Sequence, residues 1–253
     1  MSTLNVASIN SGPIGGSRNA IINGNPIINQ RGYVSGTATG GANQYTLDRW
    51  RVVTSGQSIT WADSQNVRTV TAPAGGVEQI IEGINLITGT YTLSWTGTAT
   101  ATVNGSAVAN GATVSITGGV DTTVRFINGT FSLAQFEPGT KATPFERRSY
   151  GQELALCQRY YQLFSNFSIE GYANVGSQRA VTIPMTFPVQ MRATPTRTVV
   201  TAGTFTNIRG SSTTYAGLGL IGLTATFASA SIEAAGTGYT QYTNATESMS
   251  AEL

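Results

Sequence analysis

The stretch ATATVNGSAVANGATVSI, residues 99–116, decides the fold class of this 253-residue chain. Apolar and hydroxyl side chains alternate along it in three short runs, and an Asn-Gly pair separates each run from the next. Alternation with a period of two predicts strands with one buried face. Asn-Gly favours tight turns because both residues tolerate a positive φ. We therefore predict a meander of three short antiparallel strands.

The same pattern extends to both sides of this stretch. Residues 77–87 and 90–97 read as two strands around a turn, and VRFINGTFSLAQF, residues 124–136, reads as a further hairpin closed by its own Asn-Gly pair. YTLDRWRVV, residues 45–53, also predicts a strand, near an edge because neither of its faces is purely apolar. Strands this short at this spacing indicate an all-β fold, either an antiparallel sandwich or a jelly roll.

One segment has a helical pattern, at residues 150–164. Ser149 can cap its start, with Gln152 completing a capping box. The apolar side chains form two neighbouring stripes, an arc wider than one small sheet usually covers. We expect burial between domains or between subunits, and the candidate interface residues are Leu154, Leu156, Tyr160, Tyr161 and Phe164. Cys157, the only cysteine, excludes an intrachain disulfide, and we interpret it as a buried core residue.

The pattern after the helix returns to β-structure. Residues 180–196 alternate like a strand that Pro184 and Pro188 confine to a sheet edge or a bulge, and residues 217–236 and 242–253 supply further strands. The predicted organisation is an N-terminal arm, a β-sandwich, a linking amphipathic helix and a second β-rich domain, at residues 1–18, 19–147, 148–165 and 166–253.

Composition excludes several function classes. Only 10% of residues are charged, the net charge is +2 and the basic residues are scattered, so we expect neither nucleic acid nor an anionic membrane as partner. No apolar run reaches the roughly 18 residues that span a bilayer. No basic start precedes an apolar core in residues 1–16, so these residues do not read as a signal peptide. The chain has no histidine, which removes the commonest general base and the commonest zinc ligand.

The 12 carboxylates give little sign of catalysis or of a metal site. Two carboxylates alone can hydrolyse a glycoside, and the candidate pairs are Asp48 with Asp63 and Glu78 with Glu82. We interpret all four as surface or structural residues. No acidic cluster is dense enough to predict calcium, and no glycine-rich loop predicts a phosphate site. The expectation is a protein without enzymatic activity, cofactor or metal.

Aromatic residues are the binding candidates, since sugar faces stack on rings while hydroxyl groups pair with polar side chains. Trp95 alternates with strand neighbours and is interpreted as core. Trp61 lies in the polar context SITWADSQN and is a receptor-binding candidate. Tyr215, Tyr239 and Tyr242 lie among Gly, Ser and Thr, as in adaptable binding loops, and are the other candidates. The alternative is that they are ordinary loop tyrosines.

Several separated segments resemble parts of tailed-phage fibre proteins. The most specific is FSLAQFEPGTKATPFERRSYGQELALCQRYYQ, residues 131–162, which is similar to the closing strand of a sandwich module and the helix after it. NAIINGNPIINQRG at 19–32 and DRW at 48–50 resemble the opening of that module. TFPVQMRATPT at 186–196 and SAEL at 250–253 resemble the tip domain that often follows.

The resemblance implies a carbohydrate-binding-module-like jelly roll and, usually, a homotrimer at a host-contacting end. On this basis the expected function is a virion fibre or tip protein that binds a host-surface receptor, a glycan in the first place. Residues 1–18 are small and polar, which by itself predicts a disordered leader, and with the resemblance they are expected to attach the protein to tail, baseplate or capsid proteins. Family fibres often have shaft repeats before this module, and here only a short leader is expected. The alternatives are a decoration protein of the capsid or baseplate and a polysaccharide depolymerase.

Overall fold

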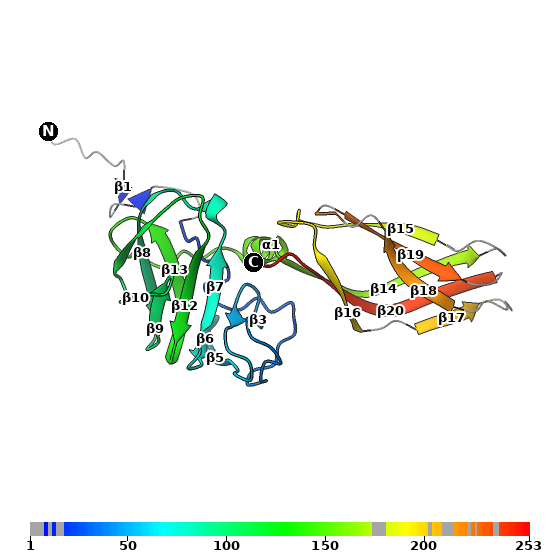
Figure 1. The fold of residues 1–253 in the computed structure, drawn as a ribbon, viewed down its shortest axis with the longest axis horizontal. Helices are drawn as coiled ribbons and strands as arrows, with labels where there is room; N and C mark the ends of the chain where they lie inside the picture. The colour runs from blue at the N-terminus through cyan, green and yellow to red at the C-terminus, as the bar shows by residue number, and fades with distance from the viewer. Residues whose placement is uncertain are drawn as a thin grey trace. The chain divides into compact units, whose positions relative to one another are not determined.

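The chain divides into two units, Met1–Cys157 with Leu253, and Gln158–Glu252. Figure 1 labels most strands of each unit in the computed structural model. The boundary lies within the predicted linker 148–165, and most of the helix belongs to the first unit. The structure describes residues 8–9, 12–13, 18–173, 181–201, 204–208, 215–221, 224–225, 227–234 and 238–253, with side chains at 18–165, 186–200, 224–225 and 246–253.

The first unit is a sandwich of two antiparallel sheets. One sheet has the order β10-β9-β12-β7-β4-β3, and the other has the order β11-β8-β13-β6-β5. Near the N-terminus β1 pairs with β2, and a short 3-10 helix, η1, follows β7. The bounds are β1 Ser8–Ile9, β2 Gly12–Pro13, β3 Gln44–Tyr45, β4 Arg51–Val52, β5 Thr60–Ser64, β6 Val67–Ala72, β7 Val77–Ile81, η1 Gly83–Asn85, β8 Gly89–Thr96, β9 Thr100–Val103, β10 Ser106–Val108, β11 Thr113–Ile116, β12 Thr122–Ile127 and β13 Gly129–Pro138.

An aromatic cluster joins the two sheets. Phe126 of β12 stacks on Phe131 of β13 with their ring centroids 4.3 Å apart, and the Trp50 ring lies 5.0 Å from Phe131. Trp95 of β8 meets Phe126 edge-on at 5.4 Å. All four side chains are buried, which confirms Trp95 as a core residue. Large aromatic surfaces taken out of water supply much of the free energy that holds such sheets together.

The Asn-Gly turns differ from the predicted hairpins. Asn104-Gly105 does close a hairpin, between β9 and β10. Asn110-Gly111 and Asn128-Gly129 instead carry the chain from one sheet to the other, since β12 pairs with β7 and β9 while β13 pairs with β6 and β8. Gly129 has φ +135°, and a Cβ there would lie 2.8 Å from the Ala99 nitrogen. At Asn128-Gly129 the glycine is therefore required by its positive φ and by the close approach of the Ala99 backbone, and not by a hairpin.

The strand expected at 45–53 is interrupted. Between β3 and β4 the chain makes a tight turn, in which the Thr46 nitrogen donates to the Trp50 carbonyl at 2.9 Å and Arg49 has φ +70°. The turn places Trp50 wholly inside the core, where its Nε1 donates to the Asn23 carbonyl at 2.9 Å. The tertiary burial of one large ring thus overrides the local strand pattern.

The helix is shorter than expected. α1 spans Tyr150–Gln158, and β14 begins at Tyr161 and continues to Ala173. The capping box is confirmed, because the Ser149 nitrogen donates to Gln152 Oε1 at 3.1 Å and the Gln152 nitrogen donates to Ser149 Oγ at 3.3 Å. The aromatic run that follows suits a strand and pairs with a partner strand far along the chain, so the prediction of helix to residue 164 was wrong.

The second unit consists of two further antiparallel sheets, β14-β20-β16 with β17 on β20, and β15-β19-β18. Pro184 lies in β15, an edge strand, as predicted.

Two further predictions are confirmed. Cys157, at the end of the first unit, is buried. The all-β fold class is confirmed, with α1 as the one α-helix among the described residues, while the jelly-roll topology stays a prediction. The bounds are β15 Val181–Thr186, β16 Thr196–Thr201, β17 Thr204–Ile208, β18 Tyr215–Ile221, β19 Phe227–Ala234 and β20 Gly238–Ser250.

Within the described ranges no helix has both the length and the apolar character needed to cross a bilayer.

Candidate functional site

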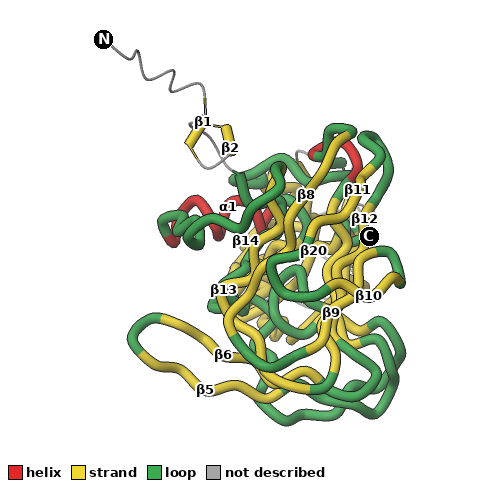
Figure 2. Tube along the Cα trace, turned by 90° about the vertical axis from the view of Figure 1, so that its left-hand side faces the viewer, coloured by secondary structure: helices red, strands yellow, loops and turns green. Residues whose placement is uncertain are grey.

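The hairpin β5–β6 stands out from the sandwich at the edge of the five-stranded sheet (Figure 2). Its turn consists of Gln65 and Asn66, with φ +47° and +63°. Two successive left-handed residues form the turn whose twist matches paired strands. The register places Asp63 opposite Arg68, so these two side chains share one face of the hairpin.

An asparagine from the start of the chain fastens this hairpin. Asn25 Oδ1 accepts from the Arg68 nitrogen at 2.9 Å, and Asn25 Nδ2 donates to the Asn66 carbonyl at 2.8 Å. The neighbouring Asn23 is itself fixed, since its Nδ2 donates to the Ile28 carbonyl at 3.0 Å. The segment NGNPII therefore holds Ile27 beside the hairpin.

Arg68 organises the exposed face of the hairpin. Its Nε and Nη2 donate to the two carboxylate oxygens of Asp63, each at 2.8 Å. Its guanidinium carbon also lies 4.6 Å from the centroid of the Trp61 ring, over the ring face. Trp61 is half-buried against the core. Arg68 thus covers a face of the ring predicted to bind receptor, and Trp61 acts here as a support for the arginine.

Tyr33, in the segment before β3, packs beside Trp61. The two ring centroids are 6.1 Å apart, and the Tyr33 hydroxyl accepts from the Ile59 nitrogen at 3.3 Å. Burial raises the pKa of Tyr33, and the hydrogen bond from Ile59 partly offsets the rise. The phenol is therefore neutral at physiological pH and serves as a packing group.

A hollow of about 520 Å³ opens beside the hairpin tip. Tyr150, the first residue of α1, forms one wall and is 62% exposed. The sequence pattern missed Tyr150, because it precedes Leu154 by one helical turn and so reads as part of the apolar stripe. The other walls of the hollow include Ile27, Asp63, Gln65, Asn66 and Arg68.

The chemistry of this hairpin hollow suits a polar, uncharged ligand. Tyr150 offers an open ring, Gln65 and Asn66 offer amide donors and acceptors, and the Asp63–Arg68 pair cancels its own charge. The hydrogen bond from Arg68, together with its positive charge, lowers the pKa of Asp63 against a weaker effect of burial. Asp63 is therefore ionised at neutral pH, so it can accept hydrogen bonds but cannot act as a general acid there.

The three predicted tip tyrosines lie in strands, not in loops. Tyr215 begins β18, while Tyr239 and Tyr242 lie within β20, which pairs with β14 on one side and β17 on the other. Their side chains lie outside the described residues, so their part in binding stays a prediction. The expectation of a loop was wrong for Tyr239 and Tyr242, because β20 is paired on both sides there, and the residues just before Tyr215 lie outside the described residues.

The predicted subunit-interface residues divide into two groups. Tyr160 and Tyr161 are only 1% and 6% exposed within one chain, so they are not free to contact another subunit. Phe164 is half-buried and packs against Phe187, with ring centroids 5.6 Å apart. Leu154 and Leu156 are also half-buried, so these two residues and Phe164 are the candidates with surface left for a subunit contact.

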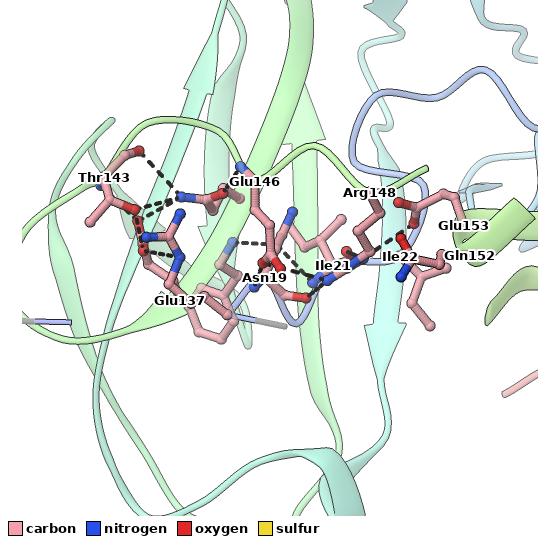
Figure 3. A network of polar contacts seen from close by, with 12 residues as sticks. Asn19, Ile21, Ile22, Glu137, Thr143, Glu146, Arg148, Gln152 and Glu153 are labelled. Atoms are coloured by element: carbon pink, nitrogen blue, oxygen red, sulfur yellow. Dashed lines mark hydrogen bonds and ion pairs between the residues drawn. The ribbon is translucent and has the colours of Figure 1, made fainter. Parts of the chain in front are cut away.

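A few residues of the segments that resemble fibre proteins form a partly buried network (Figure 3). Arg148 Nη1 donates to the Ile21 carbonyl at 3.2 Å and to Glu153 Oε1 at 3.3 Å, and its Nη2 donates to the Asn19 carbonyl. The Asn19 nitrogen donates to Glu146 Oε2 at 2.7 Å. This entry network, formed by Asn19, Glu146, Arg148 and Glu153, ties the start of the sandwich to the segment leading into α1. Its role is structural.

Of the four carboxylates considered as catalytic groups, Asp48, Glu78 and Glu82 are buried. Glu78 is buried between two arginines, at 2.7 Å from Arg51 Nη2 and 2.7 Å from Arg125 Nη2. Asp48 is buried and accepts from the Gln30 nitrogen at 2.5 Å. Glu82 is also buried. Among the described residues no group of three Cys, Asp or Glu is placed to hold a metal ion.

A scan against protein-family models finds no match, and neither does a search of curated proteins or of solved structures.

Proposed function

We propose that this chain is a non-enzymatic fibre or tip protein of a virion, and that its hairpin hollow binds a host-surface glycan. The single observation that carries the binding site is the exposed Tyr150 ring beside the fixed Asp63–Arg68 pair. Carbohydrate sites combine a ring for stacking with preorganised polar groups for hydroxyls. The virion setting rests on the sequence resemblance to phage fibres. The proposal that the sandwich is a jelly roll rests on the same resemblance.

Preorganisation supports this assignment. Asn25 fixes the hairpin backbone at two points, and Asp63 fixes the guanidinium of Arg68. A ligand then meets groups that are already oriented, so it loses less free energy to side-chain ordering. Assembly as a homotrimer would add avidity, since three weak sites on one particle bind a surface far more tightly than one. Residues 1–18 would provide attachment to the particle.

The test is a glycan array of bacterial surface polysaccharides probed with the purified chain. We expect binding to a subset of glycans, weakened about two- to twelvefold in Tyr150→Ala and unchanged in Tyr239→Ala and Tyr242→Ala. Loss in the two β20 variants alone would move the site to the second unit. Absence of any glycan binding by the folded wild-type chain would instead favour a decoration role. Release of reducing sugar from a bound polysaccharide would show a depolymerase and overturn the non-enzymatic assignment.

A further inference from the structure

Four Asn-Gly pairs lie in the first unit, and each is a point where the chain can modify itself. The glycine nitrogen can attack the asparagine Cγ, because glycine has no side chain to shield it and its backbone is conformationally free. The N–Cγ bond forms, the Cγ–Nδ2 bond breaks, and ammonia leaves with the proton of the glycine nitrogen. Water then opens the cyclic imide to aspartate or isoaspartate. The pairs are Asn23-Gly24, Asn104-Gly105, Asn110-Gly111 and Asn128-Gly129.

Two of the four asparagines are held at both ends of their amide group. Asn23 is buried, its Nδ2 donates to the Ile28 carbonyl at 3.0 Å, and its Oδ1 accepts from the Ile28 nitrogen at 3.1 Å. Asn110 Oδ1 accepts from the Trp95 nitrogen at 3.1 Å, and its Nδ2 donates to the Trp95 carbonyl at 2.7 Å. The attacking nitrogen of Gly111 is also engaged, since it donates to the Leu93 carbonyl at 2.8 Å. These side chains must give up their hydrogen bonds before they can react.

Asn104 is exposed but is bridged to β12. Its Oδ1 accepts from the Thr123 nitrogen at 2.9 Å, and its own nitrogen donates to the Thr123 carbonyl at 2.9 Å. The attack requires the side chain to rotate until Cγ lies against the glycine nitrogen, and this rotation breaks the bond to Oδ1. The bridge therefore protects the hairpin turn between β9 and β10.

Asn128 differs from the other three. It is exposed, and its side-chain amide has no hydrogen bond to any described residue. Its backbone nitrogen donates to the Pro73 carbonyl at 3.3 Å, and the next residue, Gly129, lies opposite Ala72. Because bonded and non-bonded pairs alternate along an antiparallel ladder, the Gly129 nitrogen points away from β6. The amide of Asn128 can therefore rotate freely, and β6 does not hold the nitrogen that would attack it.

We infer that Asn128-Gly129 is a site of spontaneous deamidation in the folded chain, and that the fold protects the other three pairs. The product carries one more negative charge, and its isoaspartate form has one more backbone carbon between β12 and β13. Gly129 has little room for a longer backbone, since a Cβ there would already lie 2.8 Å from the Ala99 nitrogen. The modification should therefore weaken the crossing between the two sheets. This inference does not depend on the proposed glycan binding.

The experiment incubates the purified full-length chain in mildly alkaline buffer and follows each pair by tryptic peptide mapping with mass spectrometry. Cleavage after arginine and lysine places Asn23 in peptide 19–31, Asn104 and Asn110 in 69–125, and Asn128 in 126–141. We expect Asn128 to be converted first, about tenfold faster than Asn110, whose amide must first lose two hydrogen bonds. Conversion of any other pair as fast as Asn128 overturns the inference.

Concentrated urea is the control for local sequence. All four asparagines precede glycine, so their rates should converge once the fold is lost. If Asn128 keeps its full advantage in urea, the fold does not select the site and the inference fails.

The matched variant is Asn128→Gly, which removes the amide and tolerates the positive φ of this position, +47°. Ion-exchange chromatography should show a more acidic form accumulating in wild type and not in the variant. Equal accumulation in both would contradict the assignment to Asn128. The wild-type peptide map decides the question even where the variant does not fold.

Discussion

Two arginine–carboxylate pairs of the first unit have the same chemistry and different surroundings. In the entry network the side chains of Arg148 and Glu153 are 7% and 12% exposed. On the hairpin the side chains of Arg68 and Asp63 are 15% and 55% exposed. The first pair satisfies backbone carbonyls of the chain itself, while the second keeps a carboxylate open to solvent. Burial therefore separates a pair that holds the fold from a pair that can meet a ligand.

The largest effect is expected where the buried pair is broken. Arg148→Met keeps an apolar stem but leaves the carbonyls of Asn19 and Ile21 and the carboxylate of Glu153 without their donor. We therefore expect a loss of about 3–5 kcal/mol in the free energy of unfolding. Urea denaturation followed by tryptophan fluorescence measures it. A loss below about 1 kcal/mol would show that the entry network does not hold the sandwich, and the comparison with the hairpin would fail.

An intermediate effect is expected at Asn25, which belongs to the support of the hairpin. Asn25→Ala removes two hydrogen bonds to the hairpin backbone, at Asn66 and Arg68, and should cost about 1–3 kcal/mol. Because the hairpin then loses its fixed position, glycan affinity should fall as well. Denaturation and array binding are measured on the same preparation. Full affinity in a clearly destabilised variant would show that preorganisation by Asn25 does not matter for the site.

A small, pH-dependent effect is expected at Asp63. Arg68 lowers the folded-state pKa of Asp63 below its unfolded value of about 3.9, so the pair stabilises the fold fully above that value and loses its effect as the pH falls through the folded pKa. Asp63→Asn should cost no more than about 1 kcal/mol near neutral pH, since the pair is exposed. The difference from wild type should stay constant from about pH 5 to 8 and shrink below about pH 4. Shrinkage between pH 5 and 8 would contradict the assigned pKa direction.

The strands could be predicted from the sequence, but their partners only in part. Alternation located β9, β10, β11, β12 and β13 because the two faces of a strand meet different environments. The Asn128-Gly129 pair did not reveal a crossing between sheets, because positive φ serves a hairpin and a crossing equally well. The end of α1 was missed for a related reason. Tyr161 pairs with Ser250, and no local pattern contains that contact.

The candidate site was largely hidden from sequence reasoning. It brings together Ile27, the hairpin from Asp63 to Arg68, and Tyr150, which are distant along the chain. Trp61 drew attention as a tryptophan in a polar context, yet the structure uses it to support Arg68. In the segments that resemble fibre proteins, Arg148 and Asn23 are structural, whereas Ile27 and Tyr150 line the hairpin hollow. Local patterns report packing well, but a hollow depends on tertiary neighbours.

The most direct test of the central claim uses Tyr150, whose exposure predicts the smallest change in stability. Tyr150→Ala should leave the free energy of unfolding within about 0.5 kcal/mol of wild type. Its affinity for the best array glycan, measured by calorimetry, should fall by the value of a stacked ring, about 0.5–1.5 kcal/mol or about two- to twelvefold. Ile87→Ala, an equally exposed truncation outside the hollow, is the matched control and should change neither quantity. Unchanged affinity in Tyr150→Ala would contradict the assignment of the hairpin hollow as the glycan site.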